Sequence, residues 1–218
     1  MKYPIGIQNF ESLRKDGYTY VDKTAMIHQL ASQGRYYFLS RPRRFGKSLL
    51  LSTLEAYFAG KRGLFRGLAV EKLEKDWTGF PILHLDLNTD DYQHGNVLGQ
   101  RLNLVLSQWE KLYGKDMIIN DTLTTWEKAY GREPAETTLA LRFKGIVRRA
   151  VEQSGRRVVI LVDEYDKPLL QTLDNKALQA EYRSTLKAFY SVLKSQDQYI
   201  RFALLTGVTK FGKVSVFS

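Results

Sequence analysis

The sequence contains no cysteine among its 218 residues, and only five prolines and three histidines. The absence of cysteine excludes disulfides and thiolate metal sites and fits a reducing compartment, so we expect a cytoplasmic protein. The histidines, His28, His84 and His94, show no metal-ligand spacing. No apolar run approaches the ~20 residues that span a bilayer. The first ten residues also lack the apolar core of a signal peptide, so the sequence predicts no membrane partner.

Positive charge is the unusual feature among the residues that are present. The net charge is +10, whereas 44% hydrophobic and 26% charged residues are typical of a globular domain. An excess of lysine and arginine raises the expectation of a polyanionic partner, such as a nucleotide or a nucleic acid. A solvated basic surface is the alternative. The length suits one large domain or two small ones.

The pattern of apolar residues predicts an alternation of strands and helices. Strands are expected at 35–40, 80–88, 157–166 and 199–208. Helices are expected at about 22–33, 46–60, 97–113, 137–153 and 178–193, with a small insertion between 114 and 136. This alternation indicates a three-layer α/β fold with a mostly parallel sheet. Ligands of such sheets bind outside the carboxyl ends of the strands, so the residues that follow each strand are the first candidates for a site.

The first strand leads into a basic segment that is similar to a phosphate-binding loop. The loop pattern is G-x-x-x-x-G-K-[ST], but its first position here is Arg41. Gly46 would let the backbone approach phosphates, Lys47 would reach the β- and γ-phosphates, and Ser48 would bind magnesium. The predicted cofactor-binding segment comprises Arg41, Pro42, Arg43, Arg44, Phe45, Gly46, Lys47, Ser48 and Leu49. The alternative is a basic loop followed by a well-capped helix.

The third strand is almost continuously apolar and ends in Asp163 and Glu164, the Walker B arrangement. An aspartate at this position would hold magnesium together with Ser48, and the next carboxylate would activate water as a general base. We expect the Asp163 carboxylate and the Ser48 hydroxyl to lie ~3–6 Å apart, close enough to share one ion and its waters. The alternative is that the acids only mark where a buried strand meets solvent.

Three further features are weaker candidates. Thr206 ends the fourth strand and would sense the γ-phosphate, so it joins Glu164 and Lys47 as a predicted catalytic residue; a simple strand-ending threonine is the alternative. Tyr20, or Tyr18, would stack on adenine, unless the N-terminal arm is merely packed. Asp86 ends the second strand, which we expect at the sheet edge, and we interpret it as structural. The arginines of the loop would face phosphates, a neighbouring subunit or nucleic acid, and the sequence does not choose among these.

Several segments together resemble the bacterial AAA-ATPase-like family over nearly the whole chain. They are YVDKTAMIHQL, YYFLSRPRRFGKSLLLSTLEAYFAGKRGLF, VVILVDEYDKPL and LLTGVTKFGKVSVFS. In that family arginine characteristically replaces the first loop glycine, so the resemblance accounts for Arg41. It implies ATP binding at Lys47 and Ser48, Mg²⁺ at Ser48 and Asp163, and Walker B roles for Asp163 and Glu164. Members often carry a PD-(D/E)XK nuclease-type domain after the ATPase, which makes such a domain a possible partner.

The expectation from these features is an ATPase core of the additional-strand type at 35–218, preceded by an arm at 1–34 that borders adenine. It would hydrolyse Mg-ATP to drive or gate a partner domain. The alternatives are a nucleotide-gated module with little turnover and a basic nucleic-acid binder. Such a core has five strands and a helical lid, and only four strands are predicted here. We therefore expect the last strand and the lid to be missing, unless residues 3–20 or a second copy close the edge.

Overall fold

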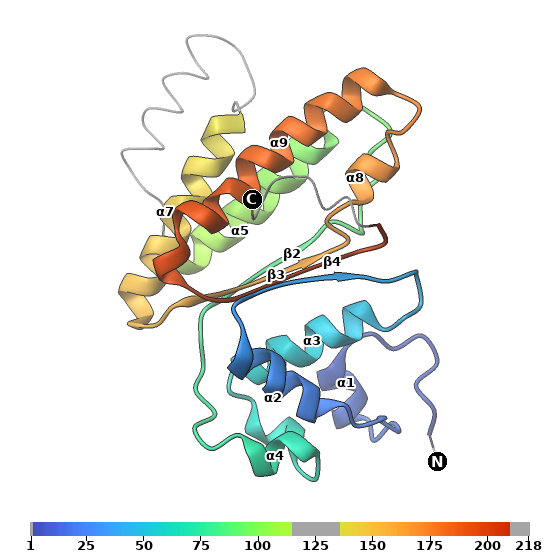
Figure 1. The fold of residues 1–218 in the computed structure, drawn as a ribbon, viewed down its shortest axis with the longest axis vertical. Helices are drawn as coiled ribbons and strands as arrows, with labels where there is room; N and C mark the ends of the chain where they lie inside the picture. Colours follow the sequence, from blue (N-terminus) through green and yellow to red (C-terminus); the bar gives the residue numbers. More distant parts are fainter. Residues whose placement is uncertain (1, 115–135, 210–218) are drawn as a thin grey trace.

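The computed structural model describes residues 2–114 and 136–209, so the predicted insertion and the segment from Lys210 onward lie outside the described residues. The described part contains a four-stranded parallel sheet in the order β1-β4-β3-β2 (Figure 1). Its strands are β1 (Tyr36–Ser40), β2 (Ile82–Asp86), β3 (Val158–Asp163) and β4 (Ile200–Gly207). Each lies within its predicted segment. The prediction of a parallel α/β sheet is confirmed, and β2 lies at an edge of the described sheet, as predicted.

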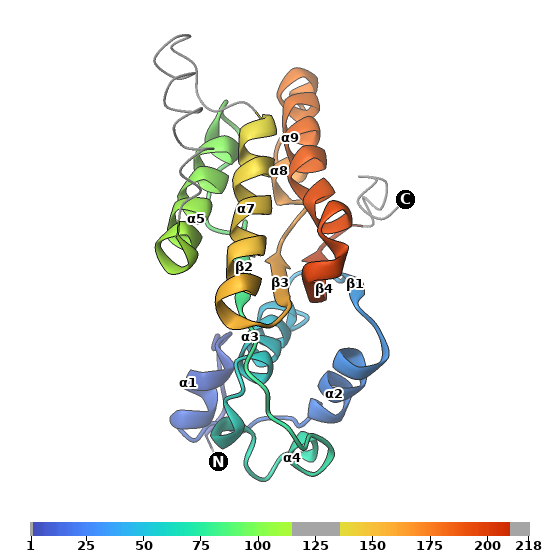
Figure 2. The same cartoon turned by 90° about the vertical axis from the view of Figure 1, so that its left-hand side faces the viewer.

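Helices cover both faces of the sheet (Figures 1 and 2). One face carries α5 (Val97–Tyr113), α7 (Glu136–Ser154), α8 (Lys167–Leu170) and α9 (Lys176–Ser195). The other carries α1 (Phe10–Lys15), α2 (Thr24–Gln33), α3 (Lys47–Phe58) and α4 (Ala69–Leu73). The described part also contains two short 3₁₀ turns, η1 (Arg62–Phe65) and η2 (Asp197–Tyr199). The longer helices were predicted. The sequence did not predict α1, α4 and α8, which are too short to show a full amphipathic period.

Two hydrophobic cores lie on the two faces of the sheet, and β3 contributes to both. Val158, Ile160 and Val162 point into the core beneath α5, α7 and α9. Val159 and Leu161 point into the core that α1, α2 and α3 cover. Successive side chains of a strand alternate between faces, so a strand buried on both faces must be apolar throughout. This burial fixes the third strand in the middle of the sheet.

The parallel register brings all four strand ends to one edge of the sheet. Ser40 pairs with Gly207, and Asp86 pairs with Asp163. The backbone continues these ladders for one more step, because the Arg41 N–H donates to the Gly207 carbonyl at 3.0 Å. The residues that leave β1, β3 and β4 therefore start from adjacent positions.

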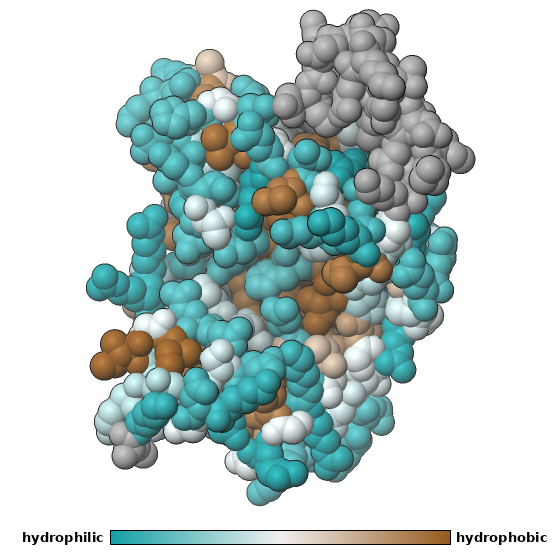
Figure 3. Space-filling view, turned by 180° about the vertical axis from the view of Figure 1, so that it is seen from behind, coloured by the Kyte–Doolittle hydropathy of each residue, from teal (hydrophilic) through white to brown (hydrophobic). Residues whose placement is uncertain are grey.

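The outer surface is mainly hydrophilic on the face that Figure 3 shows, with hydrophobic side chains in separate groups. Ile5, Val21 and Phe45 are the most exposed large hydrophobic residues of the described part. None of the helices within residues 2–114 and 136–209 is both long enough and apolar enough to cross a membrane.

Candidate functional site

The loop between β1 and α3 has two residues in the left-handed region, Arg44 at φ 68° and Gly46 at φ 73°. Glycine adopts this conformation without a steric cost, whereas arginine does so rarely. Within the described residues no side chain caps the start of α3. The first backbone N–H groups of a helix have no partner inside the helix and favour an anion. The loop side chains from Arg41 to Phe45 are exposed around this point.

Lys47 is bent back over the loop and is only 5% exposed. Its ammonium group donates to the carbonyl oxygens of Arg41 at 3.0 Å and Pro42 at 3.2 Å. It also forms an ion pair with the Glu164 carboxylate at 3.1 Å. The first helical residue of α3 therefore contacts the residue that follows β3.

Asp163 receives hydroxyl donors from two other elements. Ser48 Oγ donates to one carboxylate oxygen at 2.6 Å, and Thr206 Oγ1 donates to the other at 2.6 Å. Asp163 and Thr206 are almost completely buried. The Ser48–Asp163 distance is shorter than predicted because the hydroxyl donates directly to the carboxylate. The loop, the end of β3 and the end of β4 thus meet at one side chain.

Glu164 occupies a left-handed conformation at φ 52°. Such a backbone costs on the order of 1–3 kcal/mol for a non-glycine residue, and strained residues of this kind cluster at active sites. Its side chain is 13% exposed and faces Lys47. Each acid therefore contacts one loop residue: Glu164 forms an ion pair with Lys47, and Asp163 accepts a hydrogen bond from Ser48.

The remaining predicted residues lie in different surroundings. Tyr20 packs edge-on against Phe10, with ring centroids 5.2 Å apart, and burial raises the pKa of its hydroxyl. Its place among the α1 and α3 side chains favours packing, and a contact with adenine stays a prediction. Leu49 is partly buried against the same core. Asp86 pairs in register with Asp163 and accepts the Asn88 N–H at 2.7 Å, which orders the turn after the edge strand. Its structural interpretation stays a prediction.

Asp166 and Tyr165 are neighbours of this site that the sequence did not single out. Asp166 is completely buried, and its carboxylate accepts hydrogen bonds from Val208 and Thr209. The Tyr165 hydroxyl donates to the Thr209 carbonyl at 2.7 Å. The only signal in the sequence is a further aspartate shortly after the Asp163-Glu164 pair, which does not reveal its partners.

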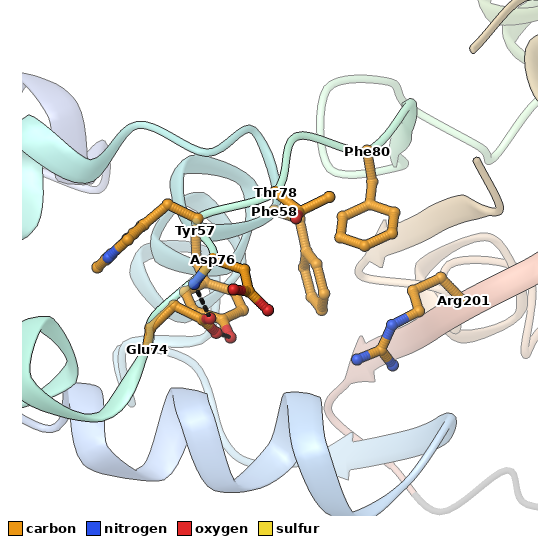
Figure 4. A pocket seen from close by; sticks show the side chains of 8 residues that line it. Tyr57, Phe58, Glu74, Asp76, Thr78, Phe80 and Arg201 are labelled. Atoms are coloured by element: carbon orange, nitrogen blue, oxygen red, sulfur yellow. Dashed lines mark hydrogen bonds between the residues drawn. The ribbon is translucent and has the colours of Figure 1, made fainter. Parts of the chain in front are cut away.

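A separate pocket lies at the opposite, amino end of the sheet (Figure 4). Arg201, the second residue of β4, lies on one side, and its guanidinium donates to the Ala31 carbonyl at 3.0 Å. On the other side Tyr57 donates to Glu74, and burial together with that carboxylate raises the pKa of Tyr57. The pocket shares no residue with the predicted site, since the loop leaves the other end of β1.

A parallel α/β sheet with a Gly-Lys-Ser loop after its first strand is consistent with a P-loop-like fold. The chain belongs to the family described as Predicted AAA-ATPase, which it matches over residues 4–217. It is 44% identical over 219 residues to a protein of Azotobacter chroococcum mcd 1 named "Uncharacterized protein in vnfD 5'region". The match covers 100% of this chain but 39% of that relative. No solved structure matches the chain.

Proposed function

We propose that this chain binds Mg-ATP at the carboxyl edge of its sheet and hydrolyses it to ADP and phosphate. The observation that carries the proposal is the pairing of two loop residues with two acids, Lys47 with Glu164 and Ser48 with Asp163. The position of β4 between β1 and β3, with Thr206 at its end, supports assignment to the additional-strand class. Membership in a family described as ATPases makes ATP the expected ligand.

The residues at this edge fit the proposed ligands chemically. A hydroxyl and a carboxylate are the oxygen donors that Mg²⁺ prefers, and Ser48 and Asp163 present them side by side. The uncapped start of α3 and the Lys47 ammonium provide positive charge for phosphate oxygens. Bound Mg-ATP supplies the bond to be cleaved and a cation that stabilises the charge developing on its oxygens.

Each side chain has a defined task in the proposed reaction. Lys47 exchanges the Glu164 carboxylate for phosphate oxygens, and this exchange frees Glu164 to take a proton from the attacking water. Asp163 and Ser48 would hold the metal. Thr206 keeps the Asp163 carboxylate oriented, and its hydroxyl would sense the γ-phosphate. Hydrolysis therefore depends on residues from three separate strand ends.

Binding and turnover are tested separately. A fluorescent ATP analogue is titrated with and without Mg²⁺, and phosphate release is measured with ATP. We expect weak but saturable binding that Mg²⁺ strengthens, and slow turnover, below about 1 per second, the lower end of the usual enzyme range. Glu164→Gln should retain binding and lose turnover. If wild type binds but does not turn over, the chain is a nucleotide-gated module; if it does not bind, the proposed function is wrong.

The partner of the ATPase also belongs to the proposal. The chain spans less than half the length of its curated relative. ATP hydrolysis would drive or gate a further domain, and the nuclease-type domain that the family resemblance implies is our candidate. The +10 charge supports nucleic acid as a second partner. Titration of duplex DNA at increasing salt tests this, because charge-driven binding weakens steeply as salt rises. The proposed location is the cytoplasm.

A further inference from the structure

A buried carboxylate joins the segment after β3 to the segment after β4. Asp166 is 0% exposed. One of its oxygens accepts from the Val208 N–H at 3.0 Å, the Thr209 N–H at 2.7 Å and the Thr209 hydroxyl at 2.7 Å. Two of these three donors are backbone groups. Asp166 therefore fixes the backbone of residues 208–209 as well as the Thr209 side chain.

Tyr165 and Gly207 complete the junction. The Tyr165 N–H donates to the Thr206 carbonyl at 2.9 Å, and its hydroxyl donates to the Thr209 carbonyl at 2.7 Å. A Cβ atom at Gly207 would lie 2.3 Å from the Tyr165 ring and 2.6 Å from the Asp166 carboxylate. Glycine is required at this position because the two segments approach so closely. Tyr165 and Asp166 thus bind the chain both before Gly207, at Thr206, and after it, at Thr209.

The Asp166 carboxylate is not used by its own helix. Asp166 directly precedes α8, where aspartate commonly caps the first N–H groups. Its side chain makes no such bond. Burial of a carboxylate is costly unless hydrogen bonds compensate for lost water, and here the compensating donors all come from the far side of the junction. Capping of α8 therefore does not explain why a carboxylate is buried at position 166.

We propose that Asp166 is a positioning residue that holds Glu164 and Thr206 in place for ATP hydrolysis. The inference rests on the function proposed above. Glu164 lies between two anchored aspartates, since Ser48 and Thr206 hold Asp163 while the β4 segment holds Asp166. Its left-handed backbone is thereby fixed from both sides. Thr206 is also fixed at two points, because it donates to Asp163 and because Asp166 binds Val208 and Thr209 shortly after it.

The test combines kinetics, binding and amide exchange on the full chain. In Asp166→Ala we expect turnover to fall about 10-fold or more, since small misplacements of catalytic groups have large effects on rate. Affinity for the ATP analogue should change less than about 3-fold, because Lys47 and Ser48 are untouched. The amides of Val208 and Thr209 should exchange faster, while those within β4 stay protected. Asp166→Asn keeps an acceptor oxygen and should lie between wild type and Asp166→Ala.

A matched control separates positioning from general stability. Glu110 of α5 is also a buried carboxylate, paired with Arg142 at 2.8 Å on the helical face away from the loop. Glu110→Gln should lower thermal stability and leave turnover and exchange at residues 208–209 unchanged. If Asp166→Ala does not fold, Thr209→Val removes one donor and should show the same changes in smaller measure.

The possible failures are distinguishable. Unchanged turnover in a folded Asp166→Ala, or unchanged exchange at Val208 and Thr209, would overturn the positioning role. Loss of turnover in Glu110→Gln equal to that in Asp166→Ala would also overturn it, because the effect would then follow stability. Absence of turnover in wild type would instead refute the hydrolysis on which the inference rests, and the positioning role would fall with it.

Discussion

At the scale of single residues, the charge of Lys47 is balanced inside the protein. Its ammonium is almost inaccessible, and its three partners are two loop carbonyls and the Glu164 carboxylate. An opposite charge at 3.1 Å makes the pair nearly neutral as a unit. Any anion that enters the loop must therefore compete with Glu164 for this lysine, which makes the lysine and the glutamate a coupled pair.

Replacing Lys47 by alanine should remove most of the ATP affinity, with a rise in Kd of about 10-fold or more, because it removes the charge that we propose binds the phosphates. The fold should persist, since the apolar cores do not use this side chain. Titration with the labelled analogue and circular dichroism check the two parts. Lys72→Ala, at an exposed lysine of α4, is the control. A Lys47→Ala protein that binds ATP like wild type would refute the phosphate-loop assignment.

At the scale of elements, α3 begins after one left-handed glycine and ends before another. Gly60 has φ 69°, and a Cβ there would lie 2.6 Å from the Trp77 carbonyl oxygen. Gly60→Ala should lower the free energy of unfolding by about 1–3 kcal/mol, from the left-handed backbone and the overlap together. Gly63→Ala is the control, because its Cβ would meet nothing within 4 Å. Urea unfolding measures both, and equal stabilities would contradict the prediction.

An ion pair ties the middle of α3 to the edge strand β2. His84 Nδ1 lies 3.0 Å from the Glu55 carboxylate. Burial alone would lower the pKa of His84, but Glu55 outweighs burial, with help from Asp86 and Asp163, and raises it. The hydrogen bond with His84 in turn lowers the pKa of Glu55.

These shifts predict a defined dependence of stability on pH. The contribution of His84 is fully present below its unfolded pKa, about 6.5, and is lost as pH rises through the raised folded value. The contribution of Glu55 is present above its unfolded pKa and is lost as pH falls through its lowered folded pKa. We expect the pair to add ~0.2–1 kcal/mol near pH 6 and little at pH 9, since Glu55 is partly exposed. Urea unfolding at both values tests this, and His84→Gln should remove the difference.

At the scale of the whole molecule, β1 pairs with β4 alone among the described strands. No described strand pairs with its outer edge, and Phe38 on this strand is 39% exposed. We expect this chain, by itself, to associate with other copies as its concentration rises. Phe38→Lys should reduce the association, because a charge on an edge strand disfavours pairing. Analytical ultracentrifugation over a concentration series would contradict this if wild type stays a 25.2 kDa monomer throughout.

Much of this architecture could be predicted from the sequence, because burial imposes a pattern. The unbroken apolar run of β3 revealed a strand covered on both faces, and the helical spacing of α5 and α9 revealed their buried sides. The sequence also singled out the loop residues and the two acids, which the structure brings into contact, while their roles stay predictions. The family match extends over the same residues.

Other features could not be predicted, because they depend on contacts that leave no local pattern. Asp166 binds backbone groups of Val208 and Thr209, and backbone donors look alike in every sequence. The packing of Tyr20 against Phe10 is such a contact, because the sequence shows only that Tyr20 precedes the loop strand, and its contact with adenine stays a prediction. The direct Ser48–Asp163 hydrogen bond depends on the exact approach of two elements that are far apart in the chain.

The strand order also governs the sequence of events during synthesis. Tyr36 of β1 pairs with Ala203 of β4, so the strand that carries the loop has no described neighbour until residues 200–207 have been made. Ribosomes add ~5–20 residues per second, so β1 waits on the order of 10 s for that partner. During this interval β2 and β3 can already pair, while the aromatic segment 36–40 is exposed to chaperones and to other nascent chains. Among the described strands β1 is therefore expected to join the sheet late, together with β4, and a ligand of the loop that follows β1 cannot assist folding before that step.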